Sequence, residues 1–221
     1  MKIYILIFSS FIFTSCTKDY KQEIWSHRVN DLSRINNLKN KCHGFEIDIY
    51  YDSSSQLTYL IHDNFSKEKL SQRNTINELK KIHFNNNSLW FDLKNNSIKN
   101  QGKALASIIE NLNKIKIKNI YIESYYPKIL KKASRAGFKT LFTFTPRKLN
   151  KIQLLREYFF IKRSNIDGLA IHYKYLLNNK LYYRDIPIFT FTVNNKNEID
   201  SITALRLPVK VILTDSLNWS N

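Results

Sequence analysis

The sequence predicts an α/β fold, a compact (β/α)8 barrel of the TIM type in which some helices are shortened or missing. Short apolar runs alternate with longer amphipathic, lysine-rich segments along most of the chain. This alternation predicts βαβ units that build a parallel sheet. At least seven such units follow one another, which favours closure into a barrel. The 221 residues are few for a fold of typically about 250, so some strand connections must lack a full helix.

Nine segments have the character of strands, although a (β/α)8 barrel has only eight places. They are residues 23–27, 45–51, 57–62, 88–93, 119–123, 138–144, 166–171, 187–193 and 209–213. One of them is therefore expected to be an edge strand, a hairpin arm or no strand. A helix is most clearly missing after residues 45–51, because only a short polar turn precedes the next strand.

Six segments are predicted to be helices. They are residues 31–41, 75–82, 98–115, 127–136, 149–163 and 196–205. In the third of these, Leu105, Ile108 and Leu112 recur with a period near 3.6 residues, which indicates one buried face. Pro127 stands at a helix start and Gly137 follows a helix end. With no internal repeat or linker visible, residues 23–221 are expected to form one barrel domain.

The first 15 residues have the pattern of an export signal. A lysine precedes an apolar run of 11 residues, and two small residues stand before Cys16. The run is too short to span a bilayer, which takes roughly 20 residues. It resembles a bacterial lipoprotein signal, in which the cysteine becomes the lipidated first residue. We therefore expect a signal peptide at 1–15, a lipidated tether at 16–22 and a place on the cell envelope, facing the periplasm or exterior. An ordinary secretory signal is the alternative.

The composition is strongly basic. The chain has 35 Lys and Arg against 18 Asp and Glu, a net charge of +17. Such an excess favours an anionic partner, such as a phospholipid surface, a phosphorylated substrate or nucleic acid. The alternative is a solvated surface in a chain rich in Lys, Asn and Ile. Nucleic acid is the least favoured partner, because no RNA-recognition motif, zinc finger or basic helix is visible.

Polar side chains gather where five successive strands are predicted to end. They are His27 and Arg28, Glu46 and Asp48, His62 and Asp63, Asp92 and Lys94, and Glu123 and Ser124. In a (β/α)8 barrel the carboxyl ends of the strands form the active face. A stable barrel does not need two histidines and several carboxylates on one rim, so the set indicates acid–base or metal chemistry.

Glu46 and Asp48 lie two residues apart in one strand and so share a face. Two buried, unpaired carboxylates would be costly, and a hard cation such as Mg2+ or Ca2+ would remove that cost. The alternative is that one of them faces solvent or pairs with Arg28 or Lys94. Asp92 and Lys94 have the same spacing, and a simple ion pair is the alternative there. Each histidine, taken alone, could be structural.

The segments "SHR", "FEID", "IHD" and "FDLK", in this order, resemble the glycerophosphodiester phosphodiesterase family. That family belongs to the phospholipase-C-like phosphodiesterase barrels. "YIESYYPKIL", "PIFTFTVNN" and "VKVILTDSL" look like its later strand segments, so the resemblance covers about residues 23–217. The chain departs from the pattern at Val29, where the family usually has glycine, and at Asp92, where many members have glutamate. Glu123 matches no family position that we can assign.

The resemblance implies a metal-dependent phosphodiesterase. Its implied roles are metal ligation by Glu46, Asp48 and Asp92, phosphate binding by Arg28 and Lys94, and acid–base catalysis by His27 and His62. Which histidine is the base does not follow from sequence. The implied substrate is a small-molecule or lipid phosphodiester, met at a membrane that the lipid anchor and basic surface would hold. Two alternatives are an inactive barrel lipoprotein that binds an anionic or phosphorylated ligand, and an adhesion or scaffolding protein of the envelope. The oligomeric state is not predicted.

Overall fold

The computed structural model describes residues 21–62, 70–84, 86–112, 115, 117–145, 151–178 and 185–216. Within them a sheet closes into a barrel of eight parallel strands, as predicted. The strands are β1 Glu23–Ser26, β2 Gly44–Asp52, β3 Leu57–Leu60, β4 Ser88–Leu93, β5 Ile120–Ser124, β6 Lys139–Thr143, β7 Gly168–His172, β8 Ile188–Phe191 and β9 Val209–Thr214. Their order is β1-β9-β8-β7-β6-β5-β4-β2-β3, and pairing of β1 with β2 closes the barrel.

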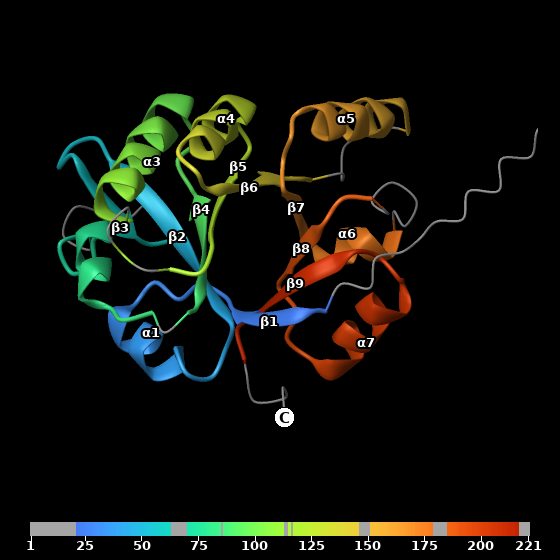
Figure 1. The fold of residues 1–221 in the computed structure, drawn as a ribbon, viewed down its shortest axis with the longest axis horizontal. Coiled ribbons are helices and arrows are strands. Elements are labelled where there is room, and N and C mark those ends of the chain that lie inside the picture. Colours follow the sequence, from blue (N-terminus) through green and yellow to red (C-terminus); the bar gives the residue numbers. More distant parts are fainter. Residues whose placement is uncertain are drawn as a thin grey trace, which may run out of the picture.

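The helices lie outside the strands (Figure 1). They are α1 Leu32–Leu38, the 3-10 helix η1 Ile76–Lys81, α3 Ile98–Leu112, α4 Pro127–Arg135, α5 Lys151–Arg163, α6 Tyr173–Asn178 and α7 Lys196–Ala204. All six predicted helical segments are present, although the second is a 3-10 helix. The short α6 was not predicted. No helix in the described ranges is both long and apolar enough to cross a membrane.

The ninth strand, β3, is a hairpin arm outside the barrel. It pairs antiparallel with β2, with Leu60 opposite Ile49 and Leu57 opposite Asp52. The tight turn is held by the Asp52 carboxylate, which accepts hydrogen bonds from the backbone N–H groups of Ser54 and Ser55 at 3.2 and 2.9 Å. Within the described residues, this hairpin and η1 occupy the connection from β2 to β4.

The inside of the barrel is filled by large side chains. One core cluster includes Trp25, Trp90, Tyr121 and Phe189, contributed by β1, β4, β5 and β8. A Cβ atom on Gly44 of β2 would lie 2.6 Å from the Trp25 ring, so the glycine makes room for this layer. Because side chains alternate between the faces of a strand, the residue two positions after each of these also faces inward. Those next residues form the rim at the carboxyl ends of the strands.

Candidate active site

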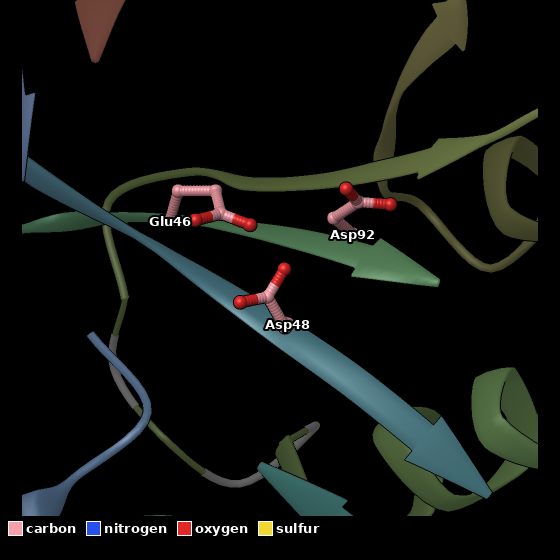
Figure 2. A group of neighbouring side chains, drawn as sticks. All are labelled: Glu46, Asp48 and Asp92. Carbon is pink, nitrogen blue, oxygen red and sulfur yellow. The ribbon is translucent and has the colours of Figure 1, made fainter. Parts of the chain in front are cut away.

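Three carboxyl groups converge on the rim between β2 and β4. Glu46 and Asp48 come from β2 and Asp92 from β4, and Asp48 pairs directly with Asp92 in the strand register. An oxygen from each lies within 4.8 Å of the others, and Figure 2 shows the three groups turned toward one another. Glu46 and Asp48 are only 2% and 0% exposed. The paired carboxylates predicted from the sequence are therefore buried and share one side of the sheet.

Lys94 and Asn30 balance the charge of Asp48. The Lys94 Nζ lies 2.9 Å from Asp48 Oδ1 and also forms an ion pair with Asp92. The Asn30 side chain donates to Asp48 Oδ2 at 2.7 Å and accepts from the Asp48 backbone N–H at 2.9 Å. Burial raises the pKa of Asp48, but Lys94 and Asn30 outweigh it and hold that pKa below its usual range. On sequence alone, ion pairs of Lys94 with Asp48 and with Asp92 are alternatives to metal binding, and both ion pairs are present.

Glu46 is compensated only in part, by Lys94 and by the Arg28 backbone N–H. Its Oε2 accepts a hydrogen bond from the Arg28 backbone N–H at 2.7 Å. Burial, reinforced by the neighbouring Asp48, raises the pKa of Glu46 well above its ordinary value. Burial also raises the pKa of Asp92, despite Lys94 beside it. One ammonium group therefore faces three carboxyl groups, two of which resist ionisation.

This donor set fits a hard divalent cation. All three side chains offer carboxylate oxygens, the ligands that Mg2+ and Ca2+ prefer. Asp48 Oδ1 is buried and, although the Lys94 ammonium is near, accepts no hydrogen bond of acceptable geometry from any described residue. A cation at this place would satisfy that oxygen and favour the ionised form of Glu46.

His27 lies at the end of β1 and is held by the end of β9. Its Nδ1 is 2.9 Å from Asp215 Oδ1, and its Nε2 is 3.7 Å from Glu46 Oε2. Asp215 is itself fixed, because Asn194 Nδ2 donates to its Oδ2 at 3.0 Å. Burial lowers the pKa of His27 to about 4, against the opposing influence of Asp215. The imidazole is therefore neutral at neutral pH.

The second histidine approaches from the hairpin. His62, just beyond β3, lies with Nε2 3.2 Å from the Arg28 Nη2. All seven predicted site residues inside the described ranges line or adjoin one small cavity of about 140 Å3. It is lined by His27, Arg28, Glu46, His62, Trp90, Asp92, Lys94, Glu123, Tyr125, Thr143, Phe191 and Leu213. The structure brings the predicted residues together, and their roles stay predictions. Cys16 and Asp63 lie outside the described residues.

Sequence reasoning left two carboxylates of the site without a role. Glu123 on β5 accepts hydrogen bonds from Trp90 Nε1 at 2.8 Å and Thr143 Oγ1 at 2.7 Å. Burial, with the nearby Asp92, raises the pKa of Glu123 to about 8. Asp215 follows β9 by one residue, as His27 follows β1, so the same end-of-strand rule could have selected it. Its pairing with His27 carries no local sequence signal.

The barrel is similar to solved glycerophosphodiester phosphodiesterases. The one from Parabacteroides distasonis aligns with a TM-score of 0.71 at 16% identity, over 90% of this chain and 94% of that one. The one from Thermotoga maritima aligns at 0.68 and 16%, over 90% and 96%. A phosphodiesterase from Oleispira antarctica, in complex with the product sn-glycerol-3-phosphate, aligns at 0.66 and 12%, over 87% and 92%.

At these identities the likeness shows the fold, and the fold is the one that the sequence resemblance implies. No protein-family model and no curated protein matches the sequence. Function therefore has to be argued from the site itself.

Proposed function

We propose that this protein is a metal-dependent phosphodiester hydrolase or lyase that acts on glycerophosphodiesters or phospholipid-type phosphodiesters. One observation carries the proposal: Glu46, Asp92, two histidines, an arginine and a lysine line a single cavity on the barrel rim, and Asp48 lies beside the two carboxyl groups. A cavity of about 140 Å3 is of the size of a phosphate group rather than of a whole phosphodiester. The likeness to glycerophosphodiester phosphodiesterase structures supports the same reaction class.

Glu46, Asp48 and Asp92 would hold the cation, Mg2+ or Ca2+. When bound, such a cation neutralises charge on a nonbridging phosphate oxygen and polarises the phosphorus atom. Arg28 and Lys94 add fixed positive charge where negative charge develops. The Arg28 guanidinium reaches the cavity beside His62, and Lys94 reaches it from β4's end. The phosphate is thus bound from both sides of the acid cluster.

The two histidines are suited to move protons. His27 is neutral, and Asp215 at its Nδ1 leaves Nε2 to take a proton from the attacking hydroxyl, of water or of the substrate. Asp215 then stabilises the imidazolium that forms. His62, on the hairpin side of the cavity, is the group left to protonate the leaving oxygen. We therefore propose His27 as the base and His62 as the acid.

The experiment is a turnover assay on metal-stripped protein. Hydrolysis of bis(p-nitrophenyl) phosphate and of glycerophosphodiesters is measured in EDTA and after adding back Mg2+ or Ca2+. We expect activity only with a cation, and 31P NMR of the product separates hydrolysis from cyclic-phosphate formation. Folded wild-type protein that turns over neither substrate with any divalent cation would refute the proposal.

A second candidate is a barrel that binds an anionic or phosphorylated ligand without turnover. The observation in its favour is Lys94, whose ammonium already pairs with Asp48 and Asp92. A lysine that permanently neutralises the cluster would displace a cation from it. Calorimetry with inorganic phosphate, with and without Mg2+, decides: phosphate binding that ignores the cation, together with no turnover, favours this candidate.

The place of action is proposed from the leader sequence. Residues 1–15 and Cys16 have the pattern of a lipoprotein signal, which would anchor the enzyme at a membrane where phospholipids and their breakdown products occur. Mass spectrometry of the purified protein tests this. We expect a lipidated N-terminal cysteine, and a Cys16→Ser variant should lose the lipid mass and leave the membrane fraction.

A further inference from the structure

A second, larger cavity adjoins the acid cluster. It has a volume of about 550 Å3, against about 140 Å3 for the cavity with the carboxylates. The two share Tyr125, Thr143 and Phe191, so they adjoin along the rim. The larger one is lined by Tyr125, Thr143, Phe144, Thr145, His172, Lys174, Tyr175 and Phe191. We call it the aromatic pocket.

Ring faces dominate the aromatic pocket. The His172 ring meets Phe191 edge-on at 5.7 Å between centroids and Tyr175 at 6.0 Å. On its other side it stacks on Tyr173 at 5.0 Å. Burial, with Lys174 nearby, lowers the pKa of His172, so at neutral pH it is one more uncharged ring. These packed rings form fixed walls against which a flat group can lie.

The charge of the aromatic pocket argues against a cationic ligand. Lys174 is the charged residue of its lining, and no carboxylate contributes among the residues described. Rings alone attract a quaternary ammonium group, but a lysine ammonium on the same wall repels it. The site therefore lacks the charge balance that a choline-type group needs.

Size and polarity exclude two other occupants. A long acyl chain needs a continuous apolar wall, whereas the hydroxyls of Thr145 and Tyr125 and the Lys174 ammonium interrupt this one. A small acyclic alcohol such as glycerol would fill little of the volume. An uncharged ring bearing hydroxyl groups matches the flat walls, the scattered polar groups and the volume together.

We propose that the aromatic pocket binds the second substituent of the phosphodiester, and that this substituent is an uncharged hydroxylated ring rather than a quaternary ammonium group. The inference rests on the proposed function, because it places the phosphate in the neighbouring acid cavity. His172, Lys174 and Tyr175, which line this pocket, become specificity-determining residues.

Three substrates separate the effects of ring and charge. Glycerophosphoinositol carries an uncharged ring, glycerophosphoglycerol an uncharged chain and glycerophosphocholine a cationic chain. We expect kcat/KM to fall in that order, by about tenfold or more from first to last. Tyr175→Ala should lower the value for the inositol substrate about fivefold and barely change the other two. Tyr175→Phe, which keeps the ring, should retain most of the preference.

Lys174→Glu tests the charge. It should raise kcat/KM for glycerophosphocholine relative to glycerophosphoglycerol about fivefold. Lys103→Glu is the matched control, because it makes the same charge change at an exposed position on α3, outside the pocket lining. Equal responses of the two variants would show a general charge effect and overturn the role of Lys174.

The outcomes separate this inference from the proposed function. If the wild type hydrolyses bis(p-nitrophenyl) phosphate but treats the three glycerophosphodiesters alike, the inference is wrong and the function stands. If no phosphodiester is turned over, the function is wrong, and calorimetric titration with glycerophosphoinositol and glycerophosphocholine decides the inference. Tighter binding of the inositol compound that weakens in Tyr175→Ala supports it, and equal or absent binding of both overturns it.

Discussion

The two halves of the barrel rim have the same backbone geometry but differ in their side chains. Around β1, β2 and β4, the inward-facing residues at the strand ends are His27, Glu46, Asp48 and Asp92, all titratable and mostly buried. Around β7 and β8 the corresponding positions hold the rings of His172 and Phe191. We call these the acid half and the aromatic half. The same backbone geometry therefore supplies a site for charge beside a site for rings.

The difference shows what the barrel contributes and what single residues contribute. In both halves, a layer of large side chains such as Trp90 and Phe189 fills the interior one step below the rim. That layer holds the rim residues in place whatever their type. Repulsion between buried like charges in the acid half lowers the free energy of unfolding, whereas the rings of the aromatic half pack favourably. Such a cost is expected where a site is kept for binding or chemistry.

The largest expected effect of a substitution lies in the acid half. Glu46→Ala and His62→Ala should each lower kcat/KM for bis(p-nitrophenyl) phosphate by about a thousandfold or more, through loss of a metal ligand or of a proton carrier. Tyr175→Ala, in the aromatic half, should lower it less than tenfold. The thermal stability of the metal-free variants serves as the folding control. Near-wild-type activity in either acid-half variant would show that the assigned site is wrong.

The next effect concerns the residue that positions His27. Asp215→Asn should lower kcat about a hundredfold, because the carboxylate at Nδ1 no longer stabilises the imidazolium. The acidic limb of the kcat/KM profile should also move to lower pH, because Asp215 raises the pKa of His27. A loss of activity with an unchanged pH profile would point to a merely structural Asp215. Asp200→Asn, on α7, is the matched control.

Most of the fold could be predicted, because strand and helix patterns are local. All nine predicted strand segments form strands. The exceptions depend on information that a local pattern lacks. The status of β3 as a hairpin arm depends on its pairing with β2, and α6 is only six residues long, too short to show a helical period. The segment 75–82 has a helical start signal, but it forms the 3-10 helix η1.

The candidate site likewise has residues that a local pattern predicts and contacts that it does not. Glu46, Asp48 and Asp92 could be selected because strand alternation places them on one face and strand ends share one rim. The hydrogen-bond partners of the site residues could not be predicted, because these pairings are contacts between residues that are distant in the chain. His27 and Asp215 are 188 residues apart in the chain. The Asn30 side chain, 18 residues away in the chain, holds Asp48 through two hydrogen bonds.

Metal binding at the acid half should stabilise the whole barrel against unfolding. For metal-stripped protein, a cation at a hundred times its dissociation constant adds about 2.7 kcal/mol to the free energy of unfolding. That corresponds to a rise in Tm of about 5–10 °C for a domain of this size. Calorimetric scans with and without Mg2+ or Ca2+ measure it. Asp92→Asn should remove most of the rise, whereas Thr145→Ala in the aromatic half should keep it. An equal rise in both variants would place the cation elsewhere.

The smallest expected effect lies at Glu123, where the halves meet. Its carboxyl group accepts one hydrogen bond from Trp90 on β4 and another from Thr143 on β6. The pKa of Glu123 is raised from 4.5 to about 8 by burial and by Asp92. Between these values the folded state binds a proton that the unfolded state has released, so stability must fall as the pH rises.

In EDTA, the free energy of unfolding of the wild type should therefore fall between pH 6.5 and pH 8, by on the order of 1–2 kcal/mol from Glu123. Urea denaturation at each pH measures it. The titration of His27 does not affect stability between pH 6.5 and pH 8, because its pKa is lowered from 6.5 to about 4. The stability that the neutral His27 contributes is lost only as the pH falls below 6.5. Glu123→Gln should make the slope shallower, with Glu46 and Asp92, whose pKa values burial also raises, accounting for the rest. Glu110→Gln, exposed on α3, should leave the slope unchanged. Parallel slopes in the wild type and Glu123→Gln would mean that this carboxyl group is already ionised, and that the acid half extends as far as β5.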